Sequence, residues 1–483
     1  MKDINFDCLI QIFNELRKDK KSLHSCLLVN KKWCNVVVSI LWKNHAWNIF
    51  GLEKKLYNTI LSCLPTSSKQ FLSNHNIKLP STIFTKPPLF NYISFCEFPE
   101  PEDINGIINM VLGRFSSNDK RIILEKETYK LFINQCKDIK FLTWKTCQPL
   151  SLFPGASTCF SQLCNLSIDP DYVDFNALYE MAKICKNLNE LAIYNCSQDN
   201  TGLISLIDAQ NNLEKIYIYH NNNIKFSSKQ LNRNVNTCEE LSKALIRKSD
   251  TINYLHLDLI NNISHSFLKS LVNLKRIDIY NKGYADTRNE IKEFQQYLAI
   301  SEFSNLQFLN IKELSCFKEL AMLIGKTKGN LTHFIIDITT DIVTKNTGML
   351  IKAISNNCPK IKTLITYIEP KDFIHVRSLL LNCRYLEDIR FYSLYDVNNN
   401  DNIGDELLDI LGRFSTNSLT NIIISEDWKY SIDAFERFFK SYSDRTLYSF
   451  NIIHRKQFYI TENHIAIIRK YVNEGVIKFS NYM

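Results

Sequence analysis

The sequence has 483 residues, of which 45% are hydrophobic and 22% are charged, and its formal net charge is +8. This balance is ordinary for a globular protein and excludes a largely disordered chain. The positive charge is spread over many lysines and does not indicate nucleic acid as a partner, and no apolar run approaches the roughly 18 residues of a membrane span. Since the first residues are polar and no CxxC pair occurs among the 15 cysteines, we expect a reduced protein of the cytoplasm, the nucleus or both.

Residues 1–47 differ from the rest of the chain. Apolar residues recur at helical spacing from Ile4 to Leu16, the charged stretch 17–21 interrupts them, and a second apolar series continues from Leu23 to Trp42. The pattern predicts two or three short amphipathic helices. A module of this size buries only a small core, so we expect it to present surplus apolar surface to a partner.

The order of residues within 4–42 resembles an F-box. That family begins with a Leu-Pro pair, an acidic residue, Leu and an Ile-Phe pair, and it ends with a Leu, a Val, a basic residue beside Trp, and Leu-Trp. Asp7 and Lys32 match the acidic and basic positions, and Asn5 stands where the family usually has Pro. The apolar matches are Ile4, Leu9, Ile12, Phe13, Leu16, Leu23, Val29, Trp33, Leu41 and Trp42. The resemblance implies that these residues bind a Skp-family adaptor and, through it, a cullin-RING ubiquitin ligase. The alternative is a helical cap on the repeats that follow.

Residues 48–135 are less regular. Six prolines interrupt the chain between 65 and 101, and helical patterns follow over Ile104–Phe115 and Lys120–Gln135. Phe90, Ile93 and Phe95 are spaced like a degenerate repeat. We predict a linker with irregular or degenerate first repeats in this segment.

Residues 136–483 repeat one motif, in which apolar anchors stand at a first position and three and five positions later. The first anchors are Ile139, Leu163, Leu188, Leu213, Ile252, Leu274, Leu306, Leu331, Ile361, Leu386, Leu419 and Leu447. They are separated by 22 to 39 residues, and repeats of 20–29 residues with this spacing are typical of leucine-rich repeats. We predict an α/β solenoid, a leucine-rich-repeat horseshoe preceded by a three-helix F-box module. The Asn-rich segments 220–236 and 396–403 are predicted to be exposed loops.

Four repeats have a cysteine three positions before the first anchor, namely Cys136, Cys185, Cys358 and Cys383, and Cys147 and Cys196 stand eight positions after it. This pattern resembles the cysteine-containing subclass of leucine-rich repeats, which often follows an F-box, although the later repeats have other residues at the second place. The cysteines could serve a metal or redox site, or be small buried core residues. No ligand cluster with zinc spacing occurs, so we favour the core and expect no metal or cofactor.

The strand positions two, four and six after each first anchor should point away from the core. In four consecutive repeats these positions are rich in Tyr, Arg and His, of which Tyr and Arg are common in interface hot spots. The candidate substrate-binding residues are Tyr194, Lys215, Tyr217, Tyr219, Tyr254, His256, Arg276 and Tyr280. Later repeats add Tyr367, Arg390 and Tyr392. The alternative is that tyrosine is simply a good strand residue.

The sequence contains none of the common phosphate-binding, HExxH, GxSxG or kinase motifs. We therefore expect a non-catalytic protein, the substrate-recognition subunit of an SCF-type cullin-RING ubiquitin ligase, whose repeats bind the target. Two alternatives are a leucine-rich-repeat scaffold or inhibitor outside any ligase, and an enzyme with an unfamiliar site. The sequence does not identify the target.

Overall fold

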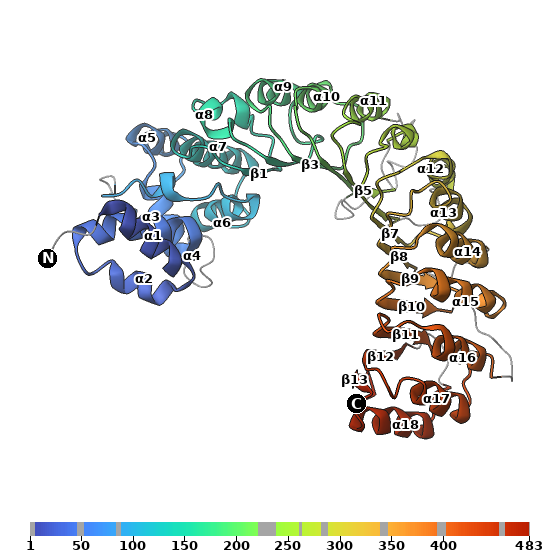
Figure 1. Cartoon of the computed structure of the whole chain (residues 1–483). Coiled ribbons are helices and arrows are strands. Elements are labelled where there is room, and N and C mark those ends of the chain that lie inside the picture. The colour runs from blue at the N-terminus through green and yellow to red at the C-terminus, as the bar shows by residue number, and fades with distance from the viewer. Residues whose placement is uncertain are drawn as a thin grey trace. The chain divides into compact units, whose positions relative to one another are not determined.

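The computed structural model describes residues 5–45, 53–83, 88–220, 238–259, 263–281, 288–338, 346–393, 402–453 and 459–482 (Figure 1). The chain divides into two compact units, Met1–Leu213 and Glu214–Met483. From residue 141 on, short strands alternate with helices within each unit, and the helices that connect the strands of a unit lie on one side of them (Figure 1).

The first unit begins with three helices, α1 (Phe6–Glu15), α2 (Lys20–Cys26) and α3 (Lys31–His45). Polar side chains cap the starts of α2 and α3: Asp19 accepts a hydrogen bond from the Ser22 amide at 3.1 Å, and Asn30 accepts one from the Trp33 amide at 2.8 Å. The helices pack around a small apolar core, made of Leu9, Phe13, Leu23, Val36, Val37, Ile40 and Leu41. The predicted short amphipathic helices are therefore present.

In the residues described, the next segment contains four helices and a 3-10 turn but no strand, which corrects the prediction of degenerate repeats there. Its helices are α4 (Glu53–Ser62), α5 (Thr66–Asn74), α6 (Pro101–Leu112) and α7 (Asn118–Gln135). The last two agree with the helical patterns of the sequence. The supposed anchors around Ile93 form a 3-10 turn, η2 (Tyr92–Phe95), instead of a strand. Ile93 is buried, and its carbonyl accepts a hydrogen bond from the Cys136 thiol at 3.4 Å, so this turn packs against the end of α7.

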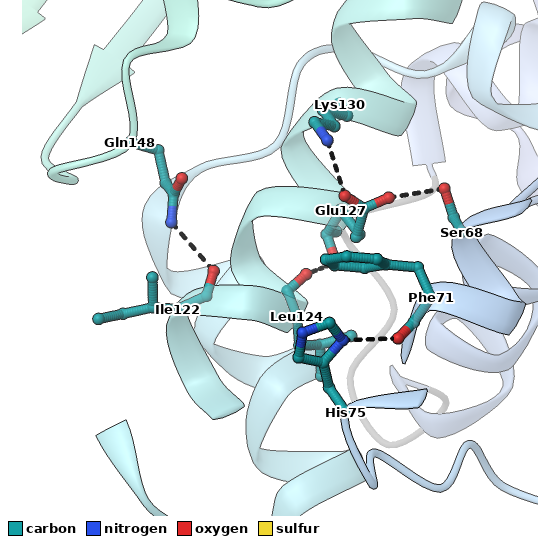
Figure 2. A network of polar contacts seen from close by, with 9 residues as sticks. Ser68, Phe71, His75, Ile122, Leu124, Glu127, Lys130 and Gln148 are labelled. Carbon is teal, nitrogen blue, oxygen red and sulfur yellow. Dashed lines mark hydrogen bonds and ion pairs between the residues drawn. The ribbon is translucent and has the colours of Figure 1, made fainter. Parts of the chain in front are cut away.

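Buried polar contacts join these helices to one another and to the first repeat (Figure 2). The buried carboxylate of Glu127 on α7 accepts a hydrogen bond from Ser68 on α5 at 2.6 Å and pairs with Lys130 at 2.8 Å. Gln148, which follows the first strand, donates to the carbonyl of Ile122 on α7 at 3.0 Å. The described parts of the segment 53–135 therefore form a packed helical body rather than a linker.

Parallel strands and returning helices make up the rest of each unit. In the first unit they are β1 (Phe141–Trp144), η3 (Leu150–Leu152), α8 (Ala156–Phe160), β2 (Asn165–Ile168), α9 (Phe175–Ile184), β3 (Glu190–Tyr194) and α10 (Thr201–Asp208). In the second unit the strands are β4 (Lys215–Tyr219), β5 (Tyr254–Asp258), β6 (Arg276–Tyr280), β7 (Phe308–Lys312), β8 (His333–Asp337), β9 (Thr363–Tyr367), β10 (Asp388–Tyr392), β11 (Asn421–Ser425), β12 (Leu447–Ile453) and β13 (Ile477–Phe479).

The helical or 3-10 segments that follow the strands of the second unit are α11 (Glu239–Arg247), η4 (His265–Ser270), α12 (Arg288–Ile300), α13 (Phe317–Ile324), α14 (Thr347–Asn357), η5 (Pro370–Asp372), α15 (Phe373–Asn382), α16 (Gly404–Phe414), α17 (Ile432–Lys440) and α18 (Glu462–Asn473). Most strands are therefore followed by one helix, which returns the chain to the next strand.

The strand register aligns the predicted anchors. In the first unit, Leu142 pairs with Leu166, which pairs with Leu191. In the second unit, the same ladder runs from Ile216 on β4 to Phe450 on β12. All these second anchors are buried, so each repeat adds one apolar rung to a shared core. The α/β architecture of leucine-rich repeats is confirmed within each unit, and the horseshoe stays a prediction. The Asn-rich segments lie almost entirely outside the described residues.

Candidate functional site

The helical module divides the F-box-like residues between its interior and its surface. Leu9, Phe13, Leu23 and Leu41 are buried in the core of the three helices. Each of these side chains is already covered by its own module, so direct contact with an adaptor is the wrong role for all four. They hold the helices together instead. Ile4 lies outside the described residues.

Other apolar residues of the module are open to a partner. Ile12 is 48% exposed and Val29 is also exposed, so a partner can reach both side chains. Phe6 and Leu28, which the family pattern does not single out, are exposed as well, Leu28 to 88%. Exposed apolar side chains concentrated on so small a module are the surface that a protein partner would cover.

The remaining matches lie between these extremes. Leu16 and Trp33 are partly buried against the module core, and the Trp33 ring meets Phe13 edge-on at 5.1 Å between centroids. Trp42 is half-buried and packs on Tyr92 of η2 at 4.4 Å. The last turns of α3 therefore attach the module to the helical body of the first unit, and Trp42 serves this contact.

The strand face of the second unit brings most of the predicted substrate-binding residues together. The register places Lys215 beside Tyr254, Tyr254 beside Arg276, and Arg276 beside Phe308. One row further along the strands, Tyr217 pairs with His256. We call the set Tyr217, Tyr219, Tyr254, His256, Arg276 and Phe308 the aromatic–arginine cluster.

The rings of this cluster contact one another across β4 and β5. Tyr217 meets Tyr254 edge-on at 5.0 Å between centroids, and Tyr219 lies 4.7 Å from the ring of His256. Such contacts contribute about 0.5–1.5 kcal/mol each beyond the area that they bury. The side chains are half-buried rather than fully covered, so the rings form an ordered surface with exposed edges.

Arg276 lies at the centre of the cluster. Its guanidinium carbon is 4.0 Å from the ring centroid of Phe308 on β7 and 5.1 Å from that of Tyr254 on β5. Its Nε donates to Asp278 at 2.7 Å, and one terminal nitrogen lies 3.5 Å from the other carboxylate oxygen. The hydrogen bonds to Asp278 raise the pKa of Arg276 further, so the guanidinium is permanently charged.

Two buried carboxylates lie close to His256 and Arg276. Asp258 is fully buried; it accepts a hydrogen bond from the His220 amide at 2.9 Å and lies 3.3 Å from Nε2 of His256. Burial would raise the pKa of Asp278, but hydrogen bonds from Arg276, Asn310 and Tyr254 outweigh it and lower that pKa, so the carboxylate stays ionised. Burial, followed by the hydrogen bond to Asp278, raises the pKa of Tyr254, so its hydroxyl keeps its proton.

Three of the predicted outward residues lie elsewhere. Tyr194 belongs to β3 of the first unit, where the Nζ of Lys145 is 4.5 Å from its ring centroid. Tyr280 ends β6 and pairs with Lys312 rather than with a ring of the cluster. The prediction was wrong for Tyr367, which is fully buried; its hydroxyl donates to the carbonyl of Ile338 at 2.7 Å and accepts from the Ile338 amide at 2.9 Å.

The repeat cysteines are core residues, as the sequence analysis favoured. Cys136, Cys185, Cys358 and Cys383 are all buried at the ends of helices. The Cys185 thiol donates to the carbonyl of Phe160 at 3.2 Å, so it links one repeat to the one before it. Cys196 is buried too, whereas Cys147 is exposed. Across the described part of the chain, no group of three or more metal-ligating side chains converges.

The sequence analysis missed Phe308 of the cluster and the burial of two carboxylates beside the cluster, for different reasons. Phe308 stands two positions after the first anchor Leu306, so the outward-position rule would have found it one repeat further along. Asp258 and Asp278 also stand at outward strand positions, and their burial depends on the side chains of neighbouring strands, which the spacing of one repeat does not specify.

Comparisons with known proteins give little beyond the repeats themselves. No protein-family model matches the sequence, and no curated protein matches it significantly. Among solved structures, a chain of the yeast Rad7–Elc1 complex overlaps 75% of this chain and 86% of its own length, with 14% identity and a TM-score of 0.31. The leucine-rich-repeat protein LegL7 of Legionella pneumophila overlaps 70% and 97%, with 13% identity and a TM-score of 0.33. Superpositions this loose carry no weight, so the architecture rests on the strands and registers above.

Proposed function

We propose that this protein is the substrate-recognition subunit of an SCF-type cullin-RING ubiquitin ligase. In this proposal the helical module binds a Skp-family adaptor, the strand face of the repeats binds the target protein, and other subunits transfer ubiquitin. The chain itself is a non-catalytic receptor of the cytoplasm or nucleus. No helix in the described ranges is long and apolar enough to cross a membrane.

One observation carries the proposal. The residues that follow the F-box order fold into three helices with a complete core, and this same module leaves Ile12, Val29 and Leu28 in solvent. Exposed apolar side chains cost free energy of solvation unless a partner covers them, at roughly 25 cal/mol per Å² of apolar surface. The F-box resemblance supplies the identity of that partner.

The repeats supply the second half of the proposal. Their strands place outward side chains in aligned rows, so residues from several repeats can contact one extended partner. Tyr and Arg are concentrated in one part of these rows, and these are the residue types that contribute most to protein–protein binding energy.

Co-purification with a Skp-family adaptor tests the proposal. The informative variant is Ile12→Asp with Leu28→Asp, because both side chains are exposed and the core remains intact. Leu9→Asp and Phe13→Asp would not separate binding from folding, since both residues are buried. We expect wild type to recover the adaptor and the double variant to recover about ten-fold less or lower, a loss of at least about 1.4 kcal/mol.

A matched control is Leu152→Asp with Ile374→Asp, which replaces two exposed apolar residues on the repeats. It adds the same charge to the same protein and should leave adaptor recovery unchanged. Absence of the adaptor from wild-type preparations, or equal loss in the control, would contradict the proposal.

The rival function is a leucine-rich-repeat scaffold or inhibitor outside any ligase. It is favoured by the burial of Leu9, Phe13, Leu23 and Leu41, since a small helical cap needs a similar set of core residues. The rival predicts target binding through the repeats without recovery of the adaptor, so the same co-purification separates the two.

A further inference from the structure

The position of Arg276 suggests what kind of partner the strand face fits. Its guanidinium lies within reach of the rings of Tyr254 and Phe308, which stand on the strands to either side of β6. A free arginine loses considerable side-chain entropy when it binds a ligand. Here the rings and Asp278 already fix the side chain, so most of that entropy is lost before any partner arrives.

Part of this guanidinium is still available. Asp278 uses the Nε and one terminal nitrogen, which is the side edge of the group. The Tyr254 hydroxyl also hydrogen-bonds the guanidinium, but Asp278 and Tyr254 together occupy only three of its five N–H groups, and the Arg276 side chain is 45% exposed. The end of the guanidinium, formed by its two terminal nitrogens, therefore presents N–H donors in the planar geometry that suits a carboxylate.

Around Arg276, the cations are more exposed than most of the carboxylates. The outward positions of β4–β8 hold three cations, Lys215, Arg276 and Lys312, and three carboxylates, Asp258, Asp278 and Asp337. Two of these carboxylates are buried, whereas Arg276 and Lys312 are exposed. An approaching partner therefore meets cations and aromatic rings first, even though the formal charges balance.

We propose that the strand face around Arg276 binds an acidic, extended segment of the target protein, with one carboxylate on the guanidinium end and apolar side chains on the rings of the cluster. The inference rests on the proposed function only in taking this segment to belong to the target. Neighbouring strands are about 4.8 Å apart, so Lys215 stands roughly 10 Å from Arg276, two strands away.

That spacing favours separate carboxylates over a single phosphate. A doubly charged phosphate needs more than one cation within contact, and Asp278 already offsets the charge of Arg276. Carboxylates on alternate residues of an extended chain are about 7 Å apart, which is a closer match to cations on different strands. The occupant is therefore an Asp- or Glu-containing segment.

Selection from a displayed library of short random peptides, with the purified full-length protein as bait and no adaptor present, tests the inference. The enriched peptides are then synthesised with a fluorophore, together with versions in which Asp and Glu become Asn and Gln, or become phosphoserine. We expect enrichment of Asp and Glu among apolar residues, and amide versions that bind wild type about ten-fold more weakly, a difference of about 1.4 kcal/mol.

Arg276→Gln should weaken the acidic peptides by about ten-fold and leave the amide versions unchanged, and Arg276→Lys should recover only part of the loss, since an ammonium group forms no planar fork. The matched control is Arg413→Gln. Arg413 also pairs with a carboxylate, since one of its terminal nitrogens lies 4.0 Å from Asp409, and its side chain is 75% exposed, but it lies on α16 and not on the strand face. We expect the control variant to bind the acidic peptides with an affinity within about two-fold of wild type.

Several results would overturn the inference: no enrichment, enrichment of neutral or basic peptides, tighter binding of the phosphoserine versions, or equal losses in Arg276→Gln and Arg413→Gln. Because no adaptor takes part, these failures are distinct from failure of the adaptor co-purification. Thermal melting of each variant shows whether a loss of binding reflects a loss of folding.

Discussion

The helical module and the repeats use apolar residues under different constraints. On a repeat strand, alternate side chains point to opposite faces, so the spacing of the anchors fixes which residues are buried. On a short helix, neighbouring residues such as Ile12 and Phe13 can both match a family pattern while one is exposed and the other buried. Spacing therefore predicts the core of the repeats more directly than it predicts the core of the module.

The largest expected effect tests this contrast inside the module. Phe13→Ala should lower the free energy of unfolding of the module by about 3–5 kcal/mol, because it removes a buried ring from a core of few residues. Ile12→Ala should change it by less than about 0.5–1 kcal/mol, since half of the side chain is already in solvent. Hydrogen exchange of the α1–α3 amides measures both, and equal losses of protection would show that Ile12 is also a core residue.

The same contrast applies along one repeat strand. Leu255→Ala should destabilise the second unit by about 2–5 kcal/mol, because the side chain is fully buried between its neighbours on β4 and β6. The adjacent Tyr254→Ala should cost about 0.5–1.5 kcal/mol, through its lost contacts with Tyr217 and Arg276. Urea denaturation followed by circular dichroism compares them; the reverse order would contradict the alternation of faces.

A third prediction concerns the polar contacts that hold the helical body. Glu127→Gln should destabilise the first unit by about 1–3 kcal/mol, because it removes the buried charge that pairs with Lys130 and weakens the hydrogen bond from Ser68. Lys126→Gln, at an exposed position of the same helix, should have an effect within about 0.5 kcal/mol. Equal melting temperatures for the two variants would show that the Figure 2 network contributes little.

The smallest expected effect concerns the reactivity of the buried cysteine thiols. Burial raises the pKa of Cys185 and Cys383 to about 12, so below that pH both stay protonated and unreactive in the folded protein. The stability that follows from a raised pKa is fully present below the ordinary thiol pKa, near 9, and is lost as the pH rises towards 12. Alkylation at pH 8 followed by mass spectrometry should modify the exposed Cys8 and Cys147 first. Rapid modification of Cys185 would contradict its burial.

The sequence predicted the repeat strands well and the intervening parts less well. The anchors at fixed spacing are the reason that β1 to β12 were expected, even β9, where Thr366 stands at the third anchor position. β13 was missed because Ile477 and Phe479 do not form the full motif. Around Ile93 a similar spacing produced a 3-10 turn, in which the Asn91 side chain accepts a hydrogen bond from the Ser94 amide at 3.4 Å.

The sequence predicted which residue types lie on the candidate surfaces, but not which of their side chains are buried. The outward positions named Tyr254 and Arg276 correctly as neighbours of one face. Burial of Asp278 and the stacking of Arg276 on Phe308 depend on registers between repeats that are more than twenty residues apart. Tyr367 shows the limit of the rule, because its strand ends there and the side chain turns to the Ile338 backbone.

The most direct test of the receptor account is affinity purification of the full-length protein from cells, followed by mass spectrometry, for wild type, Ile12→Asp with Leu28→Asp, and Arg276→Gln. The account predicts that wild type recovers a Skp-family adaptor, a cullin and at least one further protein. The module variant should lose the adaptor and cullin alone, and Arg276→Gln should lose the further protein alone. Absence of adaptor and cullin from the wild-type sample would contradict the account.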